Sequence, residues 1–128
     1  DKKDPSYLKY PVTDAMIATA TAEIEKLTDV SGASVIPQEE TLGIAIIVKP
    51  GTNEERSKAI ATLYLKALSG AAAAAYSDLK GPSDDSLGDL YTHYELIISV
   101  GTSQAAEDFT ANGTKNKSSK AIYWRKLD

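Results

Sequence analysis

The chain has 128 residues, of which 42% are hydrophobic and 25% charged, and this composition is typical of one globular domain with one core. Its net charge of −4 makes it a poor candidate for nucleic-acid binding, which relies on clustered Lys and Arg to neutralise phosphates. The sequence contains no cysteine, which excludes disulfides, thiol nucleophiles and thiolate zinc sites, and it contains no apolar run long enough to cross a bilayer.

The opening segment, residues 1–12, is polar and contains Pro5 and Pro11. We predict that it is a tether or spacer, followed by a single α+β domain over residues 13–128. A mature exported protein, including a lipoprotein trimmed after its lipidated cysteine, would open in this way, and so would an excised domain. We expect an extracytoplasmic location, with membrane attachment only through an N-terminal anchor that has been removed.

A first helix is predicted to begin after Thr13, a good N-cap residue followed by an acidic first turn, and to end near Asp29. Apolar residues recur there at steps of three and four, which places them on one face of a helix. They are Ile17, Ala20, Ile24 and Leu27.

Two strands are predicted next, a short one over 33–36 and a stronger one over 42–49. The second alternates between a large apolar face and a small, mixed face, which is typical of a sheet covered on one side. The large face consists of Leu42, Ile44, Ile46 and Val48, and the small face of Gly43, Ala45, Ile47 and Lys49.

A second helix is predicted after Pro50-Gly51, with Thr52 and Glu55 forming a capping box, and it should continue to about Ser77. Its apolar residues recur at helical spacing and are expected to pack on the sheet. They are Ile60, Leu63, Tyr64, Ala67, Leu68 and Ala71.

A third strand is predicted over 90–100, a polar loop over 102–119 with Asn112-Gly113 as a turn, and a last strand over 121–125. The fold class is therefore α+β, in the order α-β-β-α-β-β. We expect a mostly antiparallel four-stranded sheet with two helices on one face, a two-layer sandwich. Either Trp124 or Tyr123 should point into the core.

The element order is shared with the BON-type domains of bacterial envelope proteins and looks somewhat like small spore-associated lipoproteins. The matching stretch is residues 16–67, which includes the run VSGASVIPQEETLGIAIIV followed by a charged helix, and it contains no diagnostic motif. The resemblance implies association with the cell envelope and a binding role, by analogy of arrangement.

Few residues suggest chemistry. His93, the only histidine, would share a strand face with Glu95 and could act there as a general base, but no activated nucleophile accompanies the pair. Asp84, Asp85 and Asp89 lack the alternating spacing of a calcium loop, so we predict no metal and no cofactor. The segment 49–52 lacks the spacing of a phosphate loop and is interpreted as an ordinary turn and cap.

The C-terminal end is basic in an acidic chain. Its cations could contact anionic lipid or wall polymer, but we favour an edge strand on which lysines discourage aggregation. They are Lys115, Lys117, Lys120, Arg125 and Lys126.

The strongest functional hypothesis concerns the uncovered sheet face. If Trp124 packs inward with Ile122, this face carries an apolar centre and a charged rim, the anatomy of a protein interface. The centre would be Ile47, Ile97 and Tyr123, and the rim Lys49, His93, Glu95 and Arg125.

We therefore expect a non-catalytic extracytoplasmic binding or assembly domain that docks a protein partner or a second copy through this face. One alternative is a small-ligand carrier with a pocket between helices and sheet, near the alanines at 71–75. The other is a small hydrolase-like enzyme that uses His93 and Glu95.

Overall fold

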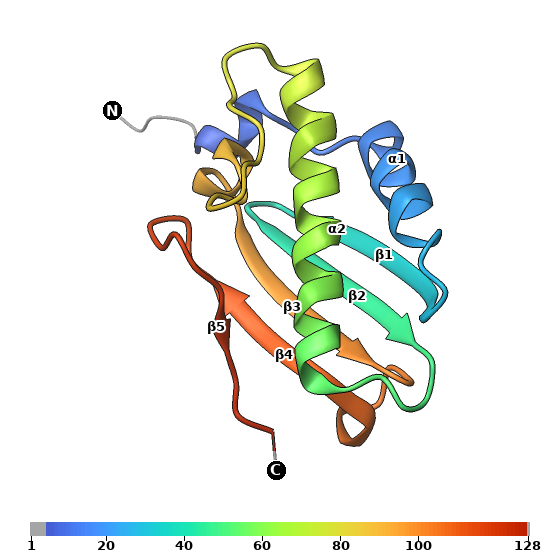
Figure 1. Cartoon of the computed structure of the whole chain (residues 1–128). Helices are drawn as coiled ribbons and strands as arrows, with labels where there is room; N and C mark the ends of the chain where they lie inside the picture. Colours follow the sequence, from blue (N-terminus) through green and yellow to red (C-terminus); the bar gives the residue numbers. More distant parts are fainter. Residues whose placement is uncertain (1–4, 128) are drawn as a thin grey trace.

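Two α-helices and a five-stranded mixed sheet form the fold of residues 5–127, the part of the chain that the computed structural model describes (Figure 1). Three short 3₁₀ helices join them. In chain order the elements are η1 (Ser6–Lys9), α1 (Asp14–Ile24), β1 (Val30–Gln38), β2 (Thr41–Val48), α2 (Glu54–Ala75), η2 (Asp89–Thr92), β3 (Glu95–Gly101), η3 (Ala106–Asp108), β4 (Phe109–Lys115) and β5 (Tyr123–Trp124).

The strands lie in the sheet in the same order as in the chain. β2 and β3 are parallel, whereas the β1–β2, β3–β4 and β4–β5 pairs are antiparallel. A parallel pair cannot be joined by a tight turn, and α2 supplies the crossover between β2 and β3. The expected four-stranded sheet is thus a five-stranded mixed sheet in which antiparallel pairs predominate.

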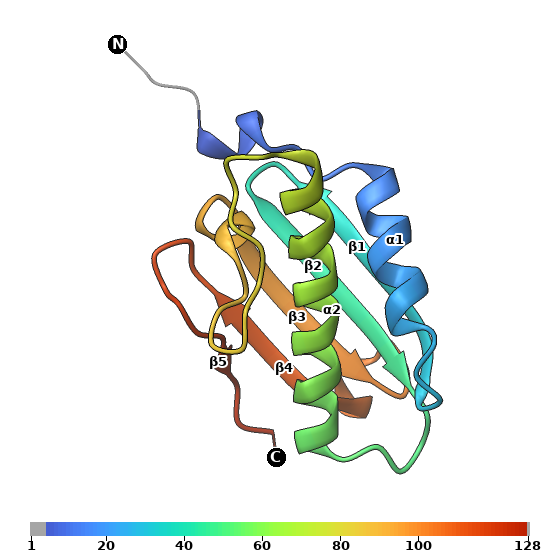
Figure 2. The same cartoon turned by 45° about the horizontal axis from the view of Figure 1, so that its top comes forward.

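Both helices lie over the same side of the sheet in the two views, with α1 beside α2 (Figures 1 and 2). The alternation predicted for β2 is present, because its large apolar residues are buried and the residues between them are partly exposed. Leu42, Ile44, Ile46 and Val48 are each at most 2% exposed.

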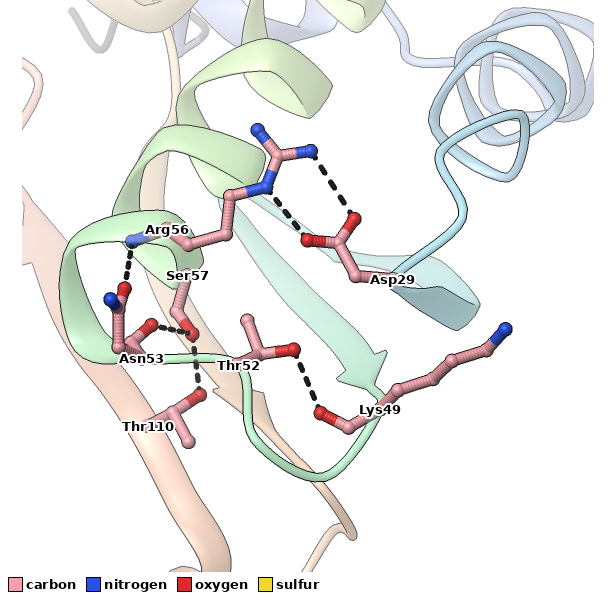
Figure 3. Close-up of polar contacts among 7 residues, drawn as sticks. All are labelled: Asp29, Lys49, Thr52, Asn53, Arg56, Ser57 and Thr110. Atoms are coloured by element: carbon pink, nitrogen blue, oxygen red, sulfur yellow. Dashed lines mark hydrogen bonds and ion pairs between the residues drawn. The ribbon is translucent and has the colours of Figure 1, made fainter.

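The start of α1 is as predicted, whereas the start of α2 is not. Thr13 Oγ1 accepts a hydrogen bond from the Met16 N–H at 3.3 Å and so caps α1. The N-cap of α2 is Asn53, whose side chain accepts from the Arg56 N–H at 2.8 Å (Figure 3). The hydroxyl of Thr52 instead donates to the Lys49 carbonyl at 2.7 Å, so it closes the preceding turn and forms no capping box.

The strand β4 occupies the segment that was predicted to be a polar loop. Gly113, expected in a turn, lies in this strand opposite Trp124. A Cβ atom at this position would lie 2.8 Å from the Trp124 ring and 2.9 Å from Ile122. Gly113 is therefore required by the close approach of the C-terminal segment.

The core differs from the predicted one on α2. Leu63, expected inside, is 46% exposed, whereas Leu65 is fully buried. Leu63 borders a surface groove beside Leu27 of the segment that follows α1. Helical spacing identifies the apolar positions of α2. It does not show which of these positions are covered by neighbouring elements and which border a groove beside α1.

The N-terminal segment packs on the domain over residues 5–12; residues 1–4 of the expected tether lie outside the described part. The Tyr7 and Tyr94 rings lie 5.8 Å apart, and the Tyr10 and Tyr76 rings 5.5 Å apart. The Tyr94 hydroxyl donates to the Tyr10 carbonyl at 2.9 Å. Aromatic packing and hydrogen bonding therefore hold residues 5–12 against the end of α2 and the start of β3.

Candidate functional site

One row of residues crosses all five strands on the sheet face opposite the helices. Strand register places its members side by side, in the order Ile36, Gly43, Ile97, Thr114 and Tyr123. Ile36 is 57% exposed, Ile97 52% and Tyr123 69%. The row therefore presents one large apolar side chain on β1, one on β3 and one on β5.

A shallow hollow of about 250 Å³ lies beside this row on the same face. Its floor is formed by small side chains of the adjacent row, Ser34, Ala45 and Ser99. Larger residues, among them Ile47 and Phe109, border it. The hollow exists because three neighbouring strands place small side chains in register.

The C-terminal strand has the orientation on which the interface hypothesis depended. Trp124 and Ile122 pack against the hydrophobic core, and the Lys58 ammonium lies 5.8 Å from the centre of the Trp124 ring. Because side chains alternate along a strand, Tyr123 and Arg125 take the opposite direction, and both are exposed. Tyr123 thus joins the row on the open face.

His93 does not belong to the rim of this face, contrary to the sequence-based expectation. It follows η2 and precedes β3, and its ring packs against that of Tyr10, with centroids 4.6 Å apart and the planes inclined by 40°. Burial lowers the pKa of His93, and its Nδ1 atom is buried without a hydrogen-bond partner in the described residues. Among those residues no hydrogen bond joins it to Glu95, which is partly exposed at the start of β3.

The other rim candidates lie around the face. Lys49 is exposed directly after β2, and Arg125 is exposed directly after β5, where its N–H donates to the Asn112 carbonyl at 2.7 Å. Ile36 was not among the residues predicted for this face, because the faces of the short first strand were not predicted. Pairing that strand with β2 across a two-residue turn would have placed Ile36 beside Gly43.

The junction between β2 and α2 contains the segment 49–52, which was compared above with a phosphate loop. Its polar groups form hydrogen bonds with other groups of the protein (Figure 3). The Arg56 guanidinium donates to the Asp29 carboxylate from Nε at 2.7 Å and from Nη2 at 3.2 Å. This bond lowers the pKa of Asp29 and raises the pKa of Arg56. The Ser57 hydroxyl donates to the Asn53 carbonyl at 2.8 Å, and the Asn53 side chain caps α2, so the polar groups here serve the helix start.

The acidic loop also has local roles. The Asp89 carboxylate accepts the Lys80 N–H at 3.0 Å, and Asp85 accepts the Ser83 hydroxyl at 2.9 Å. Within residues 5–127 no group of three or more His, Cys, Asp or Glu side chains is placed to hold a metal ion. No helix in the same range is long and apolar enough to cross a membrane.

The alanine-rich end of α2 borders a surface cavity of about 390 Å³. This cavity opens between α1 and α2, where Met16 and Ala71 line it, and not between a helix and the sheet. The position expected for a carrier pocket is therefore occupied by packed core residues, including the fully buried Leu68 and Ala72.

A scan against protein-family models, a search of curated proteins and a search of solved structures found no match to this chain.

Proposed function

We propose that this chain is a non-catalytic binding or assembly domain of a bacterial envelope protein, and that it associates with a second copy of itself through its open sheet face. The proposal takes the fold as a two-layer sandwich whose helices cover only one side of the sheet. The observation that carries it is the row containing Ile36, Ile97 and Tyr123, each more than half exposed.

The exposed row is unusual for a face that meets only water. Single exposed apolar residues are common on soluble proteins, whereas several aligned on one flat face are characteristic of contact sites. Charged residues lie around this row, Glu95 at the start of β3 and Arg125 beyond β5. An apolar centre with a polar rim fits a protein partner better than it fits a small ligand.

A second copy is favoured because the face carries both a protrusion and a matching depression. Tyr123 projects from β5, while the hollow over Ala45 lies on β2, about 15 Å away at three strand spacings. In a two-fold symmetric dimer, the same patch of each subunit contacts the other. Each Tyr123 ring can then enter the hollow of the opposite copy, and the contact is made twice.

The envelope location is supported by the sequence alone, through the resemblance in element order described above. Fractionation of source cells with an antibody against the domain tests this part of the proposal. Recovery in the cytosolic fraction would overturn the location and leave the interface to be judged separately.

The variant Ile97→Lys tests the interface. Analytical ultracentrifugation should show association of the unaltered chain at high concentration and a monomer for Ile97→Lys, because a lysine ammonium is costly in a buried apolar contact. Circular dichroism should show unchanged folding, since Ile97 is 52% exposed.

The matched control is Leu63→Lys, which alters a 46%-exposed leucine on α2, away from this face. It should leave association unchanged. A monomeric unaltered chain, or equal loss of association in both variants, would contradict the proposed interface. Unfolding of Ile97→Lys would show that the face is core.

A further inference from the structure

A further cavity lies away from the open face. This cavity of about 410 Å³ lies between the loop 85–89 and the segment 115–120, which contains the end of β4 and the turn that follows. Three lysines from the second segment line it, Lys115, Lys117 and Lys120. These lysines were expected to be solvated cations of an edge strand, and the structure places them around a cavity instead.

Lys115 is the unusual member, because it is only 5% exposed. Its ammonium donates to the Tyr91 carbonyl at 2.9 Å and to the Asn116 carbonyl at 3.1 Å. Both acceptors are neutral, and none of the ion pairs among residues 5–127 includes Lys115. An ammonium has three N–H donors, so Lys115, which lines the cavity, has one donor beyond these two bonds.

A buried ammonium without an anionic partner is costly, and burial lowers the pKa of Lys115 accordingly. An anion in the cavity would offset this cost. The two other lysines add positive charge at the same wall: Lys117 is held by Glu40 at 2.5 Å, and Lys120 is exposed. Ser118 and Ser119 line the cavity beside them, but the Ser119 hydroxyl donates to the Ala121 carbonyl at 2.8 Å, so Ser118 supplies the hydroxyl donor on this wall.

Point charges from lysine combined with a hydroxyl donor suit an oxyanion with several acceptor oxygens, as in phosphate. The opposite wall is different, since Asp85 and Asp89 lie there. Carboxylates repel an anion but accept hydrogen bonds from hydroxyl groups. The cavity is larger than a single phosphate needs and falls in the range of small-molecule pockets.

We propose that this cavity binds the phosphate ester of a small sugar or polyol. The phosphate lies against Lys115 and Lys120, and the hydroxyl groups lie against Asp85 and Asp89. Lys115 is the central phosphate-binding residue, because among the described residues that line the cavity it is the buried cation without an acidic partner. The site is independent of the open sheet face, so neither proposal depends on the other.

The test uses the whole chain with ¹³C-labelled lysine, whose Cε resonances report each ammonium separately. Inorganic phosphate, glycerol 3-phosphate and unphosphorylated glycerol are titrated in turn. We expect saturable binding of the two phosphates, tighter for glycerol 3-phosphate, none for glycerol, and an upward shift of the Lys115 pKa in the bound state. Absence of a Lys115 response at about 50 mM phosphate, which would saturate a site with a millimolar Kd, would overturn the proposal.

Two variants locate the site. Lys120→Gln should weaken binding several-fold, while Lys126→Gln, which removes an exposed lysine outside the cavity, should have no effect. Equal weakening by both would show diffuse attraction to positive charge and would overturn the site. Lys115→Met should lose binding at least tenfold; if it fails to fold, the Lys115 resonance of the unaltered chain and the Lys120→Gln comparison still decide the matter.

A further arm distinguishes the source of the ester. Glycerophosphoglycerol carries a phosphodiester, like the repeat of an anionic wall polymer, whereas glycerol 3-phosphate is a free monoester. Tighter binding of the diester would assign the site to a polymer, and tighter binding of the monoester to a free metabolite. Binding of either supports the proposed chemistry, and failure of both contradicts it.

Discussion

The two faces of the sheet are supplied by the same strands, yet they differ in the residues that they present. On β2 the covered face carries Ile44 and Ile46, each at most 2% exposed, and the open face carries Gly43 and Ala45 between them. The covered face is filled with large side chains that pack against helices. The open face is mostly small and polar, with a few large apolar residues aligned in one row.

This difference shows that burial and exposure impose separate requirements on alternate residues of one strand. A covered position requires a large side chain, because a smaller one would leave a cavity and lower the free energy of unfolding. An open position needs only compatibility with the strand, so a large apolar residue such as Ile97 calls for another explanation. The proposed contact with a second copy is one such explanation.

The largest expected effect is on the free energy of unfolding, and it distinguishes the covered face of the sheet from the open face. Ile46→Ala should lower the free energy of unfolding by about 2–5 kcal/mol, because it removes buried volume from the core. Ile97→Ala, on the open face of the adjacent strand, should change it by less than about 0.5 kcal/mol. Urea melts of dilute protein measure both. A loss below about 0.5 kcal/mol for Ile46→Ala would show that its assignment to the core is wrong.

A smaller effect is expected where the C-terminal segment crosses β4. Gly113→Ala should cost about 1–3 kcal/mol, because the added Cβ would overlap the Trp124 ring and displace β5. Trp124 fluorescence should shift to longer wavelength as the ring becomes more exposed. Gly32→Ala is the matched control, since nothing lies within 4 Å of a Cβ built there. Similar melts for both variants would contradict the proposed role of Gly113.

The smallest effect concerns His93, which lies outside both faces. Burial lowers its pKa in the folded chain below the ordinary value of about 6.5 that applies when the chain is unfolded. The unfolded chain therefore binds a proton first as the pH falls, and folding stability should decrease from pH 7.5 to 5.5. His93→Asn should flatten this decrease in urea melts. An unchanged slope would show that His93 is not the group responsible.

Local sequence determined a large part of this protein. Thr13 predicted the start of α1, and the alternation of Leu42 to Val48 predicted which side of β2 is buried. The neighbouring pair Tyr123 and Trp124 predicted one exposed and one packed aromatic residue. These predictions succeed because capping and strand alternation depend on residues close together in the chain.

Tertiary structure alone decided the remaining features. β4 has inward positions occupied by Ala111, Gly113 and Lys115, so it lacks the apolar alternation that identifies a strand, and its partners β3 and β5 define it. His93 left the expected face because the chain turns through η2 before β3 begins. The burial of Lys115 depends on Tyr91, which is distant in the chain. Such features arise where separate segments meet, and spacing within one segment carries no signal of them.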